Sequence, residues 1–154
     1  MTFFAKTFTE LTTGELHEIF RIRAQTFVVE QRCFYLDPDG KDEAAVHVGL
    51  RDADGALAAY ARLFPEEGER GVWHVGRVLA VRRGEGLGRR VMEEVERVAC
   101  EHGATLLVME AQRQAAGFYA KLGWRETGSD FDEAGIPHVR MEKRLDGAVP
   151  GGGL

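Results

Sequence analysis

The sequence predicts a single α/β domain, built on a mixed, mostly antiparallel twisted sheet with a central β-α-β unit and flanking helices. Its 154 residues fit one domain, because a domain usually holds about 100–200 residues. Hydrophobic residues make up 44% of the chain and charged residues 29%, which is typical of a globular protein that folds nearly throughout. Apolar residues alternate in some segments and recur at helical spacing in others, and glycine-rich turns separate the two kinds.

The N-terminal part is expected to hold a strand, a helix and an acidic loop. Residues 2–8 are rich in Phe and Thr, which favours a strand. Thr12 and Glu15 have the spacing of a capping box, and the apolar pattern after them predicts a helix over 13–30, continuous or broken. Residues 35–43 combine turn formers with carboxylates, so an exposed acidic loop is expected there.

The middle of the chain predicts a hairpin followed by the β-α-β unit. The segments 45–51 and 56–64 are strand-like and are joined by an Asp-Gly turn, which indicates an antiparallel pair. Apolar residues alternate over 72–81, so a long strand is expected, and an amphipathic helix opens after the glycine-rich turn that follows. The strand at 105–111 then lies parallel to the strand at 72–81, because such crossovers are right-handed and return to the same sheet.

The C-terminal part is expected to complete the sheet. A helix is predicted over 113–122, and two further strands over 124–131 and 138–145. The domain is expected to span residues 1–146, and the Gly- and Pro-containing residues 147–154 are expected to form a disordered tail.

Charge and cysteine content exclude several classes of protein. The 20 Lys and Arg against 25 Asp and Glu give a net charge of -5, so neither nucleic acid nor a membrane surface is an expected partner. No apolar run approaches the roughly 18 residues of a membrane span, and no export signal is evident at the start, so we expect a cytoplasmic protein. Cys33 and Cys100 are too few for a disulfide scaffold or a zinc module, and the acidic loop lacks the spacing of a calcium loop, so no metal is expected.

The glycine-rich turn between strand and helix is a candidate anion site. Gly84, Gly86 and Gly88 would let the backbone approach a phosphate, and a helix N-terminus offers unpaired N–H groups. Four arginines surround the turn, namely Arg82, Arg83, Arg89 and Arg90. A plain glycine connection with solvated arginines is the alternative. The Walker A and dinucleotide patterns both fail here, because the required Lys and the third glycine are missing.

Two motifs in this order resemble those of the GNAT family, the Gcn5-related N-acetyltransferases that use acetyl-CoA. Arg83-x-x-Gly86-x-Gly88 resembles the pyrophosphate-binding motif of that family. The segment from Gln112 to Trp124 is similar to its Asn-x-x-Ala-x-x-x-Tyr-x-x-x-Gly-Phe segment, with Gln for Asn and Trp for Phe. Further stretches between about Leu11 and Met141 look like the ElaA-like branch, so the resemblance implies a GNAT-like fold for most of the chain.

The resemblance also implies a binding site for acetyl-CoA. In the family, the strand before the cradle diverges from its neighbour and exposes main-chain groups to the pantetheine arm and the thioester oxygen. The resemblance implies that the following residues of this chain bind the cofactor: Leu79, Ala80, Val81, Arg83, Gly86, Leu87, Gly88, Arg89, Gln112 and Tyr119.

Acyl transfer to an amine needs a neutral amine, a stabilised oxyanion and a proton for the departing thiolate. The resemblance makes Tyr119 the candidate general acid, since a phenol can protonate a thiolate. A tyrosine that only packs the core is the alternative. For the base and for acceptor contacts the candidates are Glu30, His74, Glu110 and His138, with Glu110 and His138 preferred as catalytic groups; each could instead be structural.

The function expected from these observations is transfer of an acetyl group from acetyl-CoA to a primary amine by direct attack. The amine could belong to a small molecule, a peptide or a protein, and the acidic loop could attract a cationic acceptor. A non-catalytic acyl-CoA sensor, and a cradle for another nucleotide, are the alternatives. A homodimer could form through an exposed strand edge.

Overall fold

The computed structural model describes residues 1–145, so the expected tail at 147–154 lies outside it. One eight-stranded sheet has the order β1-β2-β3-β4-β5-β8-β6, with β7 beside β8. The strands are β1 (Thr2–Thr7), β2 (Val46–Arg51), β3 (Leu57–Pro65), β4 (Val72–Ala80), β5 (Leu106–Gln112), β6 (Arg125–Glu126), β7 (Phe131–Glu133) and β8 (Ile136–Arg144). Only β4 and β5 run parallel, and every other pair is antiparallel, so the predicted mixed sheet is confirmed.

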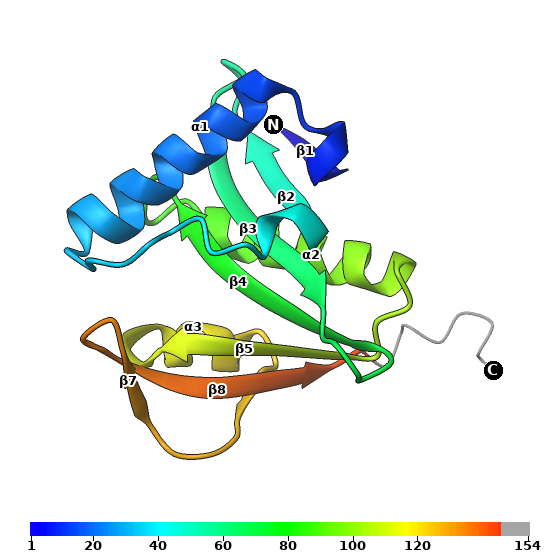
Figure 1. Ribbon diagram of the computed structural model, residues 1–154, viewed down its shortest axis with the longest axis vertical. Helices are drawn as coiled ribbons and strands as arrows, with labels where there is room; N and C mark the ends of the chain where they lie inside the picture. The colour runs from blue at the N-terminus through cyan, green and yellow to red at the C-terminus, as the bar shows by residue number, and fades with distance from the viewer. Residues whose placement is uncertain (146–154) are drawn as a thin grey trace.

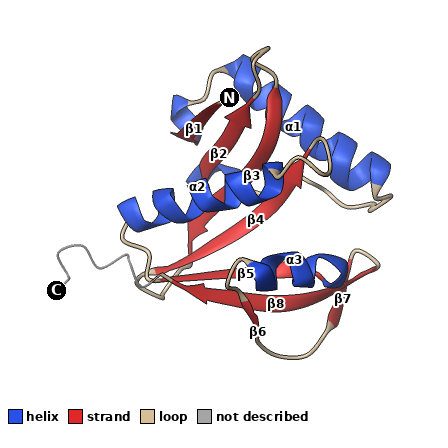
Figure 2. Cartoon of the chain, turned by 180° about the vertical axis from the view of Figure 1, so that it is seen from behind, coloured by secondary structure: helices blue, strands red, loops and turns tan. Residues whose placement is uncertain are grey.

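Helices cover both faces of this sheet. The longer ones are α1 (Thr13–Arg23) and α2 (Leu87–Glu101), and α3 (Ala116–Lys121) is a short third helix. Figure 1 shows α1 across one face of β2–β4, and Figure 2 shows α2 on the opposite face with α3 over β5 and β8. Single 3-10 turns occupy Phe8–Glu10, Asp42–Ala44 and Arg113–Ala115. None of the helices within residues 1–145 is both long and apolar enough to cross a membrane.

The first helix changes its geometry partway along. Thr12 and Glu15 form the predicted capping box, with the Glu15 N–H donating to the Thr12 hydroxyl oxygen at 3.1 Å. After Arg23 the chain continues as a π-helix over Ala24–Glu30. The predicted helix over 13–30 is therefore present with a break. π-helical turns widen the helix and are frequent at functional sites, and this one ends beside the cavity described below.

A separate apolar core lies under each face. The amphipathic α2 buries Val91, Met92 and Val95 completely against β2–β4, and full burial of such a side chain contributes roughly 1.5–3 kcal/mol. On the other face, Ile19 of α1 packs against Tyr60 and Leu79. The packing of the two cores on opposite faces of the sheet fixes the position of β4, which carries much of the candidate site described below.

The end of the sheet differs from the prediction. Instead of one strand over 124–131, two residues form β6 and a loop leads to β7, which makes a hairpin with β8. Arg113 accounts for the loop, because its guanidinium pairs with both Glu126 and Asp130 and draws the chain away from the sheet. That pairing joins groups 13 and 17 residues apart, which local strand patterns do not reveal.

The acidic loop is exposed only in part, because arginines draw two of its carboxylates into the protein. Arg23 is fully buried, and its Nε and Nη1 donate to Asp37 at 2.9 Å and to Asp42 at 2.6 Å. Both aspartates are buried as well. A buried carboxylate requires a partner of opposite charge, and the loop is consequently folded against α1 and the sheet.

Two arginines from the sheet extend this cluster. Arg62 on β3 donates from both Nη atoms to Asp39, at 2.8 and 2.6 Å. Arg77 on β4 donates to Asp37 from Nε at 2.8 Å and contacts Asp39 at 3.3 Å. Burial alone would raise the pKa of Asp39, but the hydrogen bonds and charges of the arginines outweigh it and hold the pKa well below its usual range.

Arg23→Met is expected to lower the free energy of unfolding by about 3–5 kcal/mol, because it leaves buried carboxylates without their partner. Urea denaturation of the wild type and the variant measures the difference. Arg97→Met is the control, since Arg97 pairs with Glu94 and Glu101 on the exposed surface of α2; a change of about 0.5 kcal/mol or less is expected for it. Equal effects of the two substitutions would contradict the structural role of the cluster.

Asp39→Asn is expected to reduce the loss of stability in acid. The folded-state pKa of Asp39 lies below its unfolded value, so its contribution is present above the ordinary aspartate pKa of about 3.9 and disappears as the pH falls below it. Denaturation at pH 6 and at about pH 2.5 should show a smaller difference for the variant than for the wild type. Asp54→Asn, in the exposed turn after β2, should behave like the wild type.

Candidate active site

The site begins where β4 and β5 separate. Their pairing covers only Val72 with Leu106, Trp73 with Leu107 and His74 with Val108. Beyond His74 both strands continue but diverge, as Figure 1 shows. A cavity of about 1110 Å³ lies at this opening, lined by residues of β3, β4, β5, β8, α3 and the acidic loop. The parted strands give it walls from both halves of the sheet.

Main-chain groups of β4 face the opening. The Val81 N–H donates to the Ala58 carbonyl at 2.9 Å, so the backbone of Val81 points toward β3. Alternate residues of an antiparallel strand point to opposite edges, so Leu79 shares the direction of Val81 and Ala80 faces away from β3. Of the three main-chain positions predicted for the cofactor, only Ala80 therefore offers its N–H and carbonyl to the opening.

The glycine turn predicted to cradle an anion lies directly before α2. Gly86 precedes the helix with φ of +71°, a left-handed conformation that glycine adopts without strain. The first helical hydrogen bond runs from the Arg90 N–H to the Gly86 carbonyl. The N–H groups of Leu87, Gly88 and Arg89 precede that bond, and in a helix such groups need an outside partner. Within residues 1–145 no such partner is found for them, which fits the binding of an anion.

At Gly88, the packing of a neighbouring side chain favours a residue without a Cβ. A Cβ on Gly88 would lie 3.3 Å from the Phe118 ring, which is closer than ordinary contact, whereas one on Gly86 would meet nothing within 4 Å. The absence of a side chain thus lets Phe118 of α3 pack against the first turn of α2. Phe118 is itself 39% exposed and lines the cavity, so it joins the cradle to the opening.

The four arginines around the glycine turn have different surroundings. Arg82 pairs with Glu85, Arg89 pairs with Glu93, and Arg90 lies over the Phe3 ring. Arg83 makes no ion pair within the described part of the chain, and it lines the cavity. Arg83 is thus the arginine available to a bound anion, whereas Arg89 lies outside the cavity lining.

Tyr119 on α3 stands in the cavity wall. Its side chain is 7% exposed and packs edge-on against Trp124. Within residues 1–145 its hydroxyl makes no hydrogen bond. Burial raises the pKa of Tyr119, so the hydroxyl carries its proton at neutral pH. The arrangement fits a proton donor, although the aromatic packing also stabilises the fold.

The structure brings His74 and Glu110 together across the parted strands. His74 Nε2 lies 3.2 Å from Glu110 Oε1, and Arg140 Nη1 lies 3.7 Å from Glu110 Oε2. The hydrogen bond from His74 lowers the pKa of Glu110, and the charges of His74, Arg140 and His138 lower it further against the opposing effect of burial. Glu110 is therefore ionised at neutral pH and faces the cavity.

The other predicted residues divide between the cavity and its surroundings. His138 lines the cavity; its Nδ1 donates to the Ile136 carbonyl at 2.7 Å, and its Nε2 lies 4.0 Å from Glu133 Oε2. Gln112 also lines it, but its amide bonds Gln31 at 2.8 Å and Gln114 at 2.9 Å. Glu30 is exposed and lies outside the lining, so the structure does not bring it to the site.

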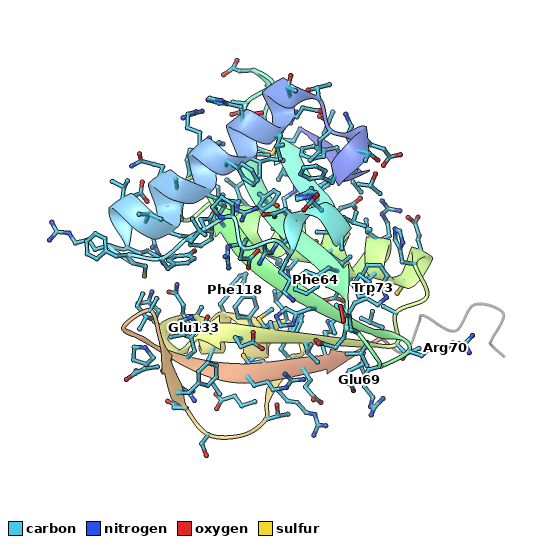
Figure 3. All side chains as sticks on the ribbon, in the orientation of Figure 1. Phe64, Glu69, Arg70, Trp73, Phe118 and Glu133 are labelled. Atoms are coloured by element: carbon cyan, nitrogen blue, oxygen red, sulfur yellow. The ribbon has the colours of Figure 1, made fainter. Side chains whose placement is uncertain are left out.

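Several residues that line the cavity could not be predicted from the sequence. Phe64, Glu66 and Arg140 border His74 and Glu110, and Phe64 is labelled in Figure 3 together with Phe118 and Glu133 from the other half of the sheet. The strand register places Phe64 opposite His74 and Arg140 opposite Glu110. Pairs of this kind follow only from a known pairing order, so no local signal marks these residues.

Within residues 1–145, no group of three or more His, Cys, Asp or Glu side chains is arranged to hold a metal ion. The cysteines Cys33 and Cys100 are free, and Cys33 lies in the cavity wall. Polar groups that border the cavity include Arg83 and the side chains of His74 and Glu110 between β4 and β5.

Known proteins with similar sequences cover nearly the whole chain. A family model described as the acetyltransferase (GNAT) domain matches residues 24–145. A UPF0039 protein of Schizosaccharomyces pombe is 34% identical over 149 residues, which is 94% of this chain and 98% of that protein. Protein ElaA of Escherichia coli strain K12 is 30% identical over 142 residues, which is 88% of this chain and 92% of ElaA.

Solved structures agree with the sequence relatives. The crystal structure of E. coli ElaA superposes with a TM-score of 0.85 at 28% identity, over 93% of this chain and 99% of that one. An acyl-CoA N-acyltransferase from Pseudomonas aeruginosa gives a TM-score of 0.85 at 29% identity, over 93% and 99% of the two chains. The family model, the sequence relatives and the solved structures thus agree, and the chain belongs to the GNAT acetyltransferase family, in its ElaA-like branch.

Proposed function

We propose that this protein transfers an acetyl group from acetyl-CoA to a primary amine by direct attack of the amine on the thioester. The observation that carries the proposal is the joining of an anion cradle at the start of α2 to a cavity between parted strands, through Arg83 and Phe118. The acceptor is a small molecule, a peptide or a protein amine. A reducing cytoplasm suits the two free cysteines.

The residues of the chain fit the donor at both of its ends. The unpaired N–H groups of Leu87, Gly88 and Arg89, together with Arg83, would hold the pyrophosphate. Ala80 would pair with the amide-containing arm and offer its N–H to the thioester oxygen. Acetyl-CoA, when bound, supplies the activated acyl group as a thioester.

Tyr119 supports the departure of the thiol. A thiolate leaves more easily when a group at the site can give it a proton, and a thiol has an ordinary pKa of about 8.5. A phenol of ordinary pKa, about 10, is protonated at neutral pH, and burial raises the pKa of Tyr119 further, so its hydroxyl has a proton to donate. Its place on the cavity wall, beside Ala115 and Phe118, supports this role.

Glu110 supports the binding and activation of the amine. A primary amine is mostly an ammonium ion at neutral pH, and it must lose a proton before it can attack. The ionised carboxylate of Glu110 would attract this cation and accept the proton, while His138 would contact the acceptor from β8.

Isothermal titration calorimetry with CoA tests the cradle. Wild-type protein should bind CoA, and Arg83→Ala should weaken binding at least about tenfold, because a charge-assisted hydrogen bond contributes about 1.5–3 kcal/mol. Arg125→Ala is the matched control, since Arg125 is exposed on β6 and pairs with Glu142. CoA should also raise the melting temperature while ATP and NAD do not. No heat with folded wild-type protein would contradict the proposed donor.

Tyr119→Phe is expected to fold normally and to lower turnover at least about tenfold, because only the proton donor is removed. Release of free thiol from acetyl-CoA in the presence of a panel of primary amines measures turnover, and calorimetry with CoA checks that binding is kept. Unchanged turnover would exclude Tyr119 as the acid. Tight CoA binding by the wild type with no amine-dependent thiol release would instead favour a non-catalytic sensor.

A further inference from the structure

His74 lies between two carboxylates that come from different parts of the sheet. Its Nε2 faces Glu110 Oε1 at 3.2 Å, and its Nδ1 faces Glu66 Oε1 at 3.4 Å. The imidazole stacks on the Phe64 ring, with 5.0 Å between centroids and an angle of 5° between the planes. The ring is thus fixed in plane and direction, with each nitrogen directed at an oxygen.

Glu66 is held in place by the turn that joins β3 to β4. Its N–H donates to the Val72 carbonyl at 2.9 Å, and the Glu69 N–H closes the turn on the Glu66 carbonyl. The side chain of Glu66 is 35% exposed, whereas that of His74 is 17% exposed. Glu66 and Glu110, the latter 31% exposed, both line the cavity and lie on opposite edges of the imidazole, Glu66 at the turn before β4 and Glu110 where β4 and β5 part.

Further charged groups lie around His74 and Glu110. On β8, Arg140 lies 3.7 Å from Glu110, and His138 is close enough to contribute its charge to Glu110. Arg62 on β3 and Lys41 in the acidic loop lie 5.5 and 5.7 Å from the Phe64 ring, on which His74 stacks. Neither cation makes a hydrogen bond to His74, so the two carboxylates are the direct partners of the imidazole.

Glu110 alone is a poor final acceptor for the proton of an ammonium ion. A carboxyl group has an ordinary pKa of about 4.3 and an imidazole one of about 6.5, so a proton that Glu110 receives passes readily to the imidazole 3.2 Å away. Burial lowers the pKa of His74, but the hydrogen bonds and charges of Glu110 and Glu66 outweigh it and raise the net value. The more basic group thus contacts Glu110 directly, and both line the cavity.

We propose that His74 takes up the proton that the acceptor ammonium loses through Glu110, and that Glu66 is the positioning residue that prepares His74 for this. The inference rests on the proposed function. In the proposed step His74 starts as the neutral imidazole, with its proton on Nδ1 toward Glu66 and the Nε2 lone pair toward Glu110. Once His74 is protonated, its Nε2–H donates the hydrogen bond to Glu110 described above. An ammonium N–H bond breaks as a Glu110 O–H bond forms; that bond then breaks as Nε2–H forms, giving an imidazolium with one N–H for each carboxylate. The imidazolium later returns its proton to water.

Two measurements on Glu66→Gln test the assignment. The first is NMR titration of ¹⁵N-histidine-labelled protein, which follows the His74 ring and needs no turnover. Removing the Glu66 charge should lower the His74 pKa. The second is the pH profile of kcat/KM with acetyl-CoA and the best amine of the panel. Its acid limb, which reports the free base, should move to lower pH by the same amount as the NMR shift.

Glu67→Gln is the matched control, because Glu67 is exposed in the same turn and makes no ion pair within the described residues. It should leave both the NMR titration and the acid limb unchanged. In a His74→Gln background, Glu66→Gln should have no further effect on kcat/KM, since the positioning residue acts only through His74.

The outcomes separate this inference from the function on which it rests. Turnover whose acid limb does not respond to Glu66→Gln, or an NMR pKa of His74 that does not move, overturns the role of Glu66 and leaves the acetyltransferase proposal standing. An absence of turnover by wild-type protein with every amine overturns the proposed function, and the proton route with it.

Discussion

The site depends on one constraint, the early end of the pairing between β4 and β5. Three residue pairs join the strands, and beyond His74 the main-chain groups of the two strands no longer hydrogen-bond to each other. Backbone N–H and carbonyl groups away from water need hydrogen-bond partners. The opening between the two strands therefore offers main-chain groups to a ligand that carries amides. The same parting lets His74 and Glu110, from different strands, meet in the cavity instead of being covered by sheet neighbours.

The buried charge cluster explains how the walls of this opening are held. Arg77 sits at an irregular point of β4, with φ of +54° and a shift in the register with β3. A non-glycine residue in this conformation is uncommon and needs support from its surroundings. The two hydrogen bonds from Arg77 to Asp37 supply it, and Arg23 holds the same aspartate from the other side. The loop and the bulged strand therefore form one rigid wall.

The sequence predicts those features of the fold that depend on residues close together in the chain, such as the starts of helices. Gly86 marks the left-handed residue before α2, and the Thr12 and Glu15 pair marks the start of α1. The burial of Asp37 was out of reach, because its partners lie 14 and 40 residues away and turn propensities describe only neighbours. The assignment of Gly88 to phosphate approach stays a prediction, and its contact with Phe118 could not be foreseen, because the packing of α3 on α2 is not a local signal.

The same limit applies to the proton-handling groups. His74 and Glu110 could be named as titratable candidates, but their contact follows from the shared end of two parallel strands. Glu66 carried no signal, since only the register of β3 with β4 brings the turn that holds it next to His74.

The short junction between β4 and β5 also divides the sheet into two leaves, β1 to β4 and β5 to β8, joined edge to edge by three residue pairs. Val75 of the first leaf and Leu107 and Met141 of the second belong to one apolar core. The width of the gap is therefore set by the side-chain packing that the leaves share, and not by the strand hydrogen bonds alone.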